Sequence, residues 1–283
     1  MKLFYFRGAD GATNFGDELN RYLWPRLLPG VFDREDGRQF VGIGTLLNDR
    51  LPTASRIIVL GSGVGYYGPP QRSERWSIYC VRGPLSAKAL GLGHDAAVTD
   101  PAALIVRVTT TPAPSARIPC AFMPHWQSEP DAWKDVCARA GVGFIDPREQ
   151  PERVLAAIRR TDVLVTEAMH GAIVADALRI PWVPVRSRPA INAFKWDDWC
   201  GSMGLTYHPH DLPTIWPALR NAGIIRRARR QAKMMSAARA LTQAARHGRP
   251  ILSRTEVLHE RLDQLEARLE QLRRNECLGT VSV

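Results

Sequence analysis

The sequence predicts an α/β protein: two Rossmann-like, doubly wound parallel-sheet domains that face a cleft, followed by a helical C-terminal tail. Three observations predict this fold. Short apolar runs alternate with helical patterns over roughly the first 200 residues, which is typical of parallel sheets covered by helices. One polar, proline-rich break interrupts the alternation at residues 108–119. After residue 211 only helical patterns follow.

The first domain is expected over residues 1–110. We expect strands at residues 2–6, 57–60 and 77–81, a helix that starts near residue 17, and a second helix at residues 85–90. The run at 57–60 is fully apolar and ends at Gly61-Ser62-Gly63, as a buried parallel strand does. Pro84 suits the first turn of the helix that follows it.

The second domain is expected over residues 116–211 and repeats the same alternation. We expect strands at residues 118–123, 142–145, 162–166 and 182–185, and helices at residues 131–140, 151–160 and 170–178. Ligands of such sheets bind where the strands end and the helices begin. The polar residues at the strand ends are therefore the first candidates for a functional site.

Residues 212–283 form the expected basic helical tail. They contain 14 Lys/Arg and 6 Asp/Glu, a difference of +8, which leaves +2 of the total of +10 for the first 211 residues. A basic helix is expected at residues 224–245, and a leucine heptad pattern of about two repeats at residues 257–274. The leucines allow two interpretations: a helix that pairs with a second copy, giving a homo-oligomer, or a helix packed on its own domain.

Composition excludes several classes of protein. The 283 residues are 45% hydrophobic and 23% charged, as in ordinary globular domains, and no apolar run reaches the length of a membrane span. The five cysteines form no close pair, so neither a disulfide framework nor a metal site is indicated, and the thiols should be structural. Because residues 1–7 do not form a signal peptide, we expect a cytoplasmic protein.

Polar side chains follow three of the expected strands. They are Asn14 with Asp17, His125, and Glu167 with His170. The last pair is the most informative, because residues three apart share one face of a helix start. Gly171 could leave room for close approach of a ligand. Each also has a structural interpretation, with Asp17 capping a helix and His170 bonding to the backbone.

Five segments together resemble the polysaccharide pyruvyl transferase family, and within it the bacterial exopolysaccharide branch of succinoglycan biosynthesis proteins. The resemblance spans roughly residues 1–200 in family order, in segments that are Asn14-Phe15-Gly16-Asp17, Gly61-Ser62-Gly63, Val81-Arg82-Gly83-Pro84-Leu85-Ser86, Thr99-Asp100-Pro101 and the longest, from Thr166 to Leu178. Many relatives carry an arginine two residues before the motif histidine, where this chain has Ala168. Other cations must therefore bind the donor.

The resemblance implies two Rossmann-like halves arranged as in two-lobed glycosyltransferases. It also implies a reaction: the enolpyruvyl unit of phosphoenolpyruvate is transferred onto two hydroxyls of a sugar, and phosphate is released. We expect no further cofactor and no metal. The expected acceptor is a lipid-linked oligosaccharide at the inner face of the cytoplasmic membrane, where the basic tail could contact anionic lipid.

The donor carries a carboxylate and a phosphate, which arginine binds well. Among the cations that follow strands, which are Arg7, Arg82, Arg186, Arg188 and Lys195, we select Arg82 and Arg186 because each lies next to an apolar strand. His170 is the expected general acid, with Glu167 to tune it or to act as base, and Asp17 as a second base. His125 could bind phosphate. The remaining expected substrate-binding residues are Asn14, Gly16, Gly61, Ser62 and Gly171.

The sequence also allows two other interpretations of the function. A two-lobed glycosyltransferase that uses a nucleotide sugar would keep the fold and change the reaction. A nucleic-acid-binding or scaffold protein would depend on the basic tail and its heptads, but no aromatic residue lies between Arg226 and Arg254, which argues against base stacking. We therefore expect no nucleic-acid partner. The aromatic group after the last strand, Phe194, Trp196 and Trp199, is expected to be a hydrophobic cluster rather than a sugar platform.

Overall fold

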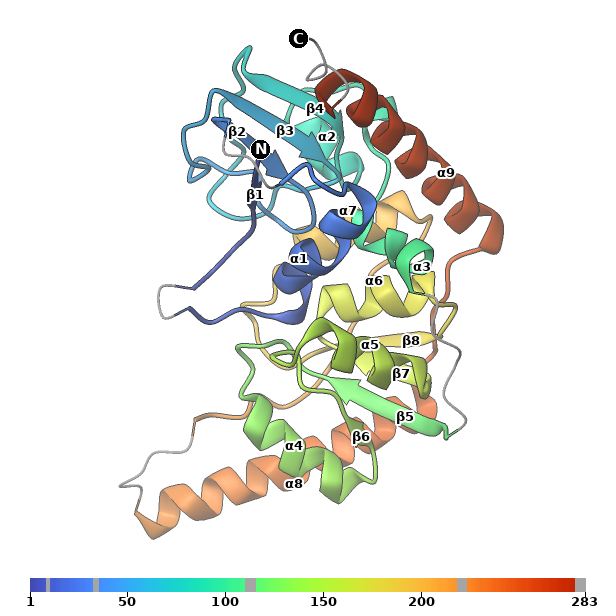
Figure 1. Cartoon of the computed structure of the whole chain (residues 1–283). Helices are drawn as coiled ribbons and strands as arrows, with labels where there is room; N and C mark the ends of the chain where they lie inside the picture. The colour runs from blue at the N-terminus through green and yellow to red at the C-terminus, as the bar shows by residue number, and fades with distance from the viewer. Residues whose placement is uncertain (9–10, 33–35, 110–115, 218–222, 278–283) are drawn as a thin grey trace. The chain divides into compact units, whose positions relative to one another are not determined.

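The computed structural model describes residues 1–8, 11–32, 36–109, 116–217 and 223–277, and it confirms the α/β class (Figure 1). The chain forms two units. Unit 1 contains Met1–Thr110, Asn192–Tyr207 and Ser253–Val283, and unit 2 contains Thr111–Ile191 and His208–Leu252. Residues 110–115, where the domain boundary was expected, lie outside the described residues. The sequence led us to expect three successive segments, but the chain returns to unit 1 twice, at Asn192 and at Ser253.

Unit 1 is built on a parallel sheet with the strand order β1-β2-β3-β4. The strands are β1 (Lys2–Phe4), β2 (Arg38–Val41), β3 (Arg56–Leu60) and β4 (Trp76–Cys80). Strand β2 was not among the expected strands, because polar Arg38 and Gln39 precede only two apolar residues. The α-helices are α1 (Phe15–Leu27), α2 (Pro84–Ala89), α3 (Ile105–Val108), α7 (Ala193–Ser202) and α9 (Thr255–Leu272). Short helical turns are η1 (His94–Ala96), η2 (Pro101–Leu104) and the π-helical η3 (Arg273–Cys277).

The loops after β2 and β3 are fixed to helix α1 and to one another. Buried Asn20 of α1 donates to the carbonyl of Ile43 and accepts the Ile43 N–H, each at 3.0 Å. Trp24 packs edge-on against Phe40 of β2, with ring centroids 4.7 Å apart. Ser62, after β3, donates its hydroxyl to the carbonyl of Gly44. The carboxyl edge of this sheet is therefore a set of interlocked turns.

Helix α9 packs on its own unit. The five heptad leucines are all buried, and α9 contacts β4 and η2; the leucines are Leu258, Leu262, Leu265, Leu269 and Leu272. Beyond the helix, buried Glu276 of η3 pairs with Arg38 and Arg56 and accepts the hydroxyl of Tyr79. One carboxylate thus joins the chain end to three strands. A homo-oligomer remains a prediction, and it would need a surface other than this leucine face.

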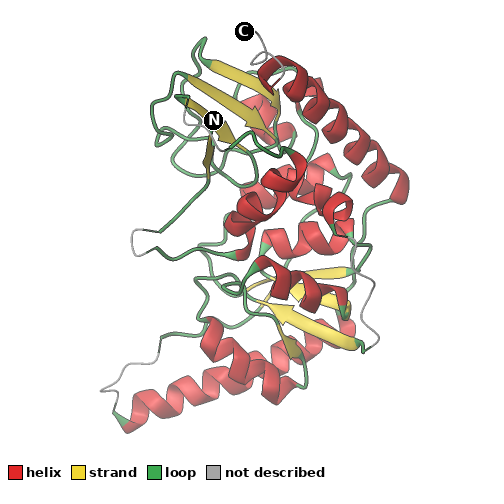
Figure 2. Cartoon of the chain, in the orientation of Figure 1, coloured by secondary structure: helices red, strands yellow, loops and turns green. Residues whose placement is uncertain are grey.

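Unit 2 is built on a second parallel sheet, with the strand order β6-β5-β7-β8-β9. The strands are β5 (Ile118–Met123), β6 (Gly143–Phe144), β7 (Thr161–Thr166), β8 (Trp182–Arg186) and β9 (His210–Asp211). The helices are α4 (Pro130–Ala140), α5 (Pro151–Arg159), α6 (Met169–Ala177) and α8 (Ile224–His247). Figure 2 shows that helices cover both faces of this sheet.

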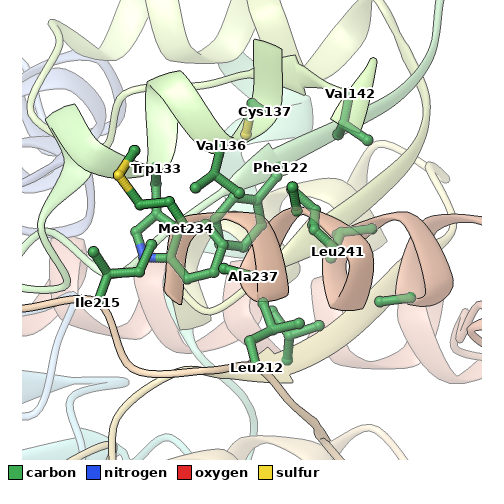
Figure 3. Close-up of a cluster of buried hydrophobic side chains, with 14 of the residues drawn as sticks. Phe122, Trp133, Val136, Cys137, Val142, Leu212, Ile215, Met234, Ala237 and Leu241 are labelled. Carbon is green, nitrogen blue, oxygen red and sulfur yellow. The ribbon is translucent and has the colours of Figure 1, made fainter. Parts of the chain in front are cut away.

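Helix α8 is a layer of unit 2 rather than a separate tail. With α4 it covers one face of the sheet, where Phe122 and Val165 pack among Trp133, Met234 and Leu241 (Figure 3). Helices α5 and α6 contact the sheet through β7 and β8. The buried side chains of α8 lie only at residues 234–244, and their spacing gave no sign of which sheet they cover. The sequence therefore predicted the helix but not its position.

No helix among the described residues is both long enough and apolar enough to cross a bilayer.

Three cysteine thiols lie in surroundings that suppress their ionisation. Burial raises the pKa of Cys80 and of Cys137 to about 12, and that of Cys120 to about 11. At neutral pH these thiols are protonated and inert, which fits the expectation that they are structural.

Candidate active site

Glu167 organises the carboxyl edge of the unit 2 sheet. It follows β7, is completely buried, and accepts three hydrogen bonds. One oxygen accepts the backbone N–H of His125, after β5, at 3.1 Å. The other accepts the backbone N–H and the hydroxyl of Ser187, after β8, at 2.6 and 2.8 Å. Its carboxylate therefore fixes the turns after three strands, and a role as proton acceptor stays a prediction.

His125 lies half-buried in the turn that Glu167 holds. Its Nδ1 accepts the backbone N–H of Gln127 at 3.3 Å, so a neutral imidazole would carry its proton on Nε2. Arg188 donates to the carbonyl of Gln127 at 2.5 Å and closes the same turn from the β8 side. The ring is thereby set up as a hydrogen-bond donor, which is the chemistry that phosphate binding requires. Contact with phosphate itself stays a prediction.

His170 lies half-buried in the first turn of α6, one turn beyond Glu167. The start of α6 is fixed by Thr166, whose hydroxyl accepts the Ala168 N–H at 3.0 Å. No acidic residue stands in the first turn of this helix. The positive end of the helix and the imidazole of His170 therefore come together, an arrangement that suits an anionic substrate.

Gly171 is required for packing. A Cβ atom at this position would lie 2.8 Å from the sulfur of Met123 and 2.9 Å from the hydroxyl of Thr166. The glycine lets α6 pack closely on the ends of β5 and β7. This supplies a structural reason for the residue, and the expected approach of a ligand at Gly171 stays a prediction.

Neither of the two selected arginines is a free cation. Arg82 is completely buried, and its Nε donates to Asp198 of α7 at 3.0 Å. Its other nitrogens donate to the hydroxyl of Thr45 at 2.7 Å and to the carbonyl of Val64 at 2.9 Å. Arg186 pairs at 2.9 Å with Asp211 of β9. Both arginines thus neutralise carboxylates of their own unit, and donor binding by either one stays a prediction.

The glycines after β3 also have structural reasons. Gly61 has a φ of +84°, and a Cβ atom there would lie 2.4 Å from the ring of Pro101. A Cβ atom on Gly63 would lie 2.3 Å from the guanidinium carbon of Arg82. Ser62 is completely buried between them. This turn therefore packs around Arg82, and contact of Gly61 or Ser62 with a substrate stays a prediction.

Asn14, Gly16 and Asp17 form the start of α1. The Asn14 side-chain oxygen accepts the backbone N–H of Gly16 at 3.0 Å and of Asp17 at 3.3 Å, and its amide donates to the Asp17 carboxylate. The helix cap is therefore Asn14, whereas Asp17, for which capping was the structural alternative, lies in the first turn of the helix. Substrate contacts of Asn14 and Gly16, and the role of Asp17 as a base, stay predictions.

Lys195 of α7 is one of the cations that follow strands, but it was not selected from the sequence as a donor-binding residue. It is 8% exposed, and among the described residues its ammonium has no hydrogen-bond or carboxylate partner. The nearest aromatic ring, that of Tyr66, has its centroid 5.8 Å from Nζ. A buried ammonium without a counterion is costly unless an anion binds it. One feature of the sequence indicated this burial. Lys195 lies four residues before Trp199, so the two side chains share the apolar face of α7.

The aromatic group after β8 is a buried cluster, as expected. Trp196 and Trp199 are at most 1% exposed, and Trp196 stacks on Tyr207 with centroids 4.7 Å apart. Their faces are therefore covered by protein.

Across the described ranges, no group of three or more His, Cys, Asp or Glu side chains could hold a metal ion.

Each parallel sheet thus has polar or charged side chains after its strands, the position at which α/β proteins bind their ligands. Comparison with known proteins makes this specific. A family model described as polysaccharide pyruvyl transferase matches residues 33–189. The chain is also 39% identical over 217 residues to the succinoglycan biosynthesis protein ExoV of Rhizobium meliloti (strain 1021), covering 75% of this chain and 68% of that protein.

The chain therefore belongs to the polysaccharide pyruvyl transferase family, and the resemblance inferred from its motifs is confirmed. Membership makes it a transferase. The matched segment contains Glu167 and His170, together with the unit 1 residues from Gly61 to Arg82. Lys195 lies six residues beyond it.

Proposed function

We propose that the chain transfers the enolpyruvyl unit of phosphoenolpyruvate onto two hydroxyls of one sugar in an exopolysaccharide repeat unit, forming a cyclic pyruvate ketal. Family membership and the likeness to a succinoglycan biosynthesis protein support this proposal. The observation that carries it is His170: a half-buried imidazole, at the start of a helix whose first turn has no acidic residue, inside the segment that matches the family. The proposed acceptor is a lipid-linked oligosaccharide, handled in the cytoplasm.

The reaction begins with a proton. His170 donates it to the methylene carbon of phosphoenolpyruvate, and the neighbouring carbon becomes cation-like. One sugar hydroxyl attacks that carbon and loses its proton, phosphate then leaves, and the second hydroxyl closes the ring. The sugar gains the atoms of one pyruvate less one water, and the donor's remaining atoms leave as phosphate. The reaction balances without an oxidant, a nucleotide or a further cofactor.

Within unit 2, His125 is proposed to donate its Nε2–H to the donor phosphate. In unit 1, Lys195 is proposed separately to bind an anionic group of a substrate, because Arg82 and Arg186 already pair with carboxylates whereas Lys195 has no such partner in the described part of the chain. Glu167 acts here as a positioning residue that holds the His125 turn.

The test is incubation of the protein with phosphoenolpyruvate and lipid-linked oligosaccharides extracted from membranes, followed by mass measurement. We expect a gain of one pyruvate less one water, together with stoichiometric phosphate. Release of a nucleotide from a nucleotide sugar, without consumption of phosphoenolpyruvate, would instead identify a glycosyltransferase.

Two substitutions assign the roles. His170→Gln should remove the mass gain while the free energy of unfolding stays within about 1 kcal/mol, because the side chain is half-buried. Lys195→Met should raise the KM of the substrate whose anionic group it binds, whether phosphoenolpyruvate or the acceptor, by roughly tenfold or more, the effect of one lost charged hydrogen bond, whereas Lys195→Arg should restore part of it. Full activity of H170Q would exclude His170 as the proton donor.

A further inference from the structure

The first turns of α8 stand apart from the rest of unit 2. Figure 1 shows them extending past the end of α4, and the buried residues of the helix begin only at Met234. We call the preceding part the basic tip and define it as Trp216 with residues 223–233. Three apolar side chains of the tip are unusually exposed: Ile224 by 87%, Ile225 by 70% and Trp216 by 65%. Arg230 donates to the carbonyl of Trp216 at 3.3 Å and holds the tryptophan beside the helix.

The charges in the basic tip are opposite in sign to those that stabilise the start of a helix. Five cations lie within about 15 Å of helix and no Asp or Glu occurs between Asp211 and Glu256; the cations are Arg226, Arg227, Arg229, Arg230 and Lys233. The first turn has no acidic residue and no side-chain cap. Cations at the positive end of a helix repel its dipole, so the arrangement is unfavourable in isolation. A bound anionic surface would reverse this cost.

We propose that the basic tip docks the protein on bilayers that contain anionic lipid. Exposed isoleucines and a tryptophan suit the boundary between headgroups and acyl chains, and the cations behind them suit the negative headgroups. The apolar tip enters the interface and the cationic turns remain at the level of the phosphates. This docking does not depend on the proposed reaction, and it would hold for a soluble acceptor as well.

Nucleic acid is the competing partner for a cationic helix, and the apolar residues decide against it. Phosphate contacts with DNA need cations and polar groups, and neither requires two neighbouring isoleucines to be exposed. Burial of such side chains in a bilayer interface recovers free energy that contact with a nucleic-acid backbone does not. The basic tip therefore fits a lipid surface better than a polynucleotide.

The experiment is flotation of the full chain with vesicles of phosphatidylcholine alone and of phosphatidylcholine mixed with phosphatidylglycerol. We expect binding only to the mixed vesicles, weakening as salt is added. The variant Arg226→Ser/Arg227→Ser/Arg229→Ser should bind roughly 100-fold more weakly, at about fivefold for each cation. The variant Ile224→Ser/Ile225→Ser should lose about tenfold or more.

A matched control removes charge from the same helix outside the basic tip. Arg239 and Arg246 are exposed and lie about 20 Å or more along the helix from Ile225. Arg239→Ser/Arg246→Ser should keep binding to within about threefold, because the distance exceeds the screening length. The helix content and unfolding midpoint of each variant check that α8 remains folded through its anchors at Met234 and Leu241.

Three results would overturn the proposal. Equal binding to both kinds of vesicle, or no binding to the mixed ones, would remove the anionic surface as partner. An equal loss in the control variant would move the interaction away from the basic tip. Salt-sensitive binding of arbitrary duplex DNA without vesicle binding would assign the cations to nucleic acid.

Discussion

The two units differ in how a buried charge secures the carboxyl edge of the sheet. In unit 1, Arg82 is neutralised by Asp198, and the pair is further bonded by Ser86 and Thr45. In unit 2, Glu167 has no cationic partner among the described residues and is held by two backbone N–H groups and one hydroxyl. In both units the charged residue next to a strand is used to fix turns. The proposed proton donor His170 lies in the first turn of α6 in unit 2, and Lys195 lies in the first turn of α7 in unit 1.

The largest expected effect is in unit 1. Arg82→Ala leaves the Asp198 carboxylate buried without its partner, which should lower the free energy of unfolding by about 3–5 kcal/mol. Urea unfolding measures the loss, and Arg75→Ala, at an exposed arginine of the same unit, is the control. If R82A stayed as stable as R75A but lost activity, Arg82 would be the donor-binding cation that the sequence suggested.

The next effect tests unit 2. Glu167→Gln turns an amide N–H₂ toward backbone donors, so at least one hydrogen bond is lost. The free energy of unfolding should therefore fall by about 1.5–3 kcal/mol. Glu152→Gln, at an exposed position in the same unit, should change nothing measurable. An unchanged stability with loss of one limb of the pH–rate profile would make Glu167 a proton acceptor after all.

A smaller effect is expected at Gly171, where packing and ligand approach make different predictions. Gly171→Ala forces the new methyl group against Met123 and Thr166, which should cost about 1–3 kcal/mol in urea unfolding. Gly223→Ala, at the N-cap of α8 where nothing lies within 4 Å, is the control for an added methyl group that meets no neighbour. A raised KM for donor or acceptor at unchanged stability would favour the ligand interpretation.

The smallest effect belongs to a surface ion pair. A hydrogen bond from Arg38 lowers the pKa of Asp36 from its usual 3.8 to about 2. Its contribution is therefore present above pH 3.8 and is lost as the pH falls toward 2. Because Asp36 is one-third exposed, the contribution should stay below about 1 kcal/mol. Asp36→Asn should flatten the pH dependence of unfolding in this window; a steeper dependence would contradict the assignment.

The elements could be predicted from the sequence because their signals are local. The strand at residues 118–123 and the helix beginning at Pro151 needed only apolar spacing and a proline at the first turn. The short strands β2 and β9 could not be predicted, because Arg38 and His210 give no apolar run and pairing with a neighbour makes them strands.

The site was harder to predict, since it depends on contacts distant in sequence. Arg82 looked available because nothing nearby shows that Asp198, 116 residues later, neutralises it. Lys195 looked like surface charge because its burial depends on the packing of α7. The position of His170 at a helix start could be predicted, because motif and helix start coincide in one short segment.

The division of unit 1 into first, middle and last segments affects how the protein is made. Its sheet is synthesised before the leucine helix that covers β4 and before the carboxylate at Glu276. Until both have followed, β4 lacks the apolar cover that this helix provides. A premature stop anywhere before residue 253 would thus damage the oldest part of the chain as well as the newest.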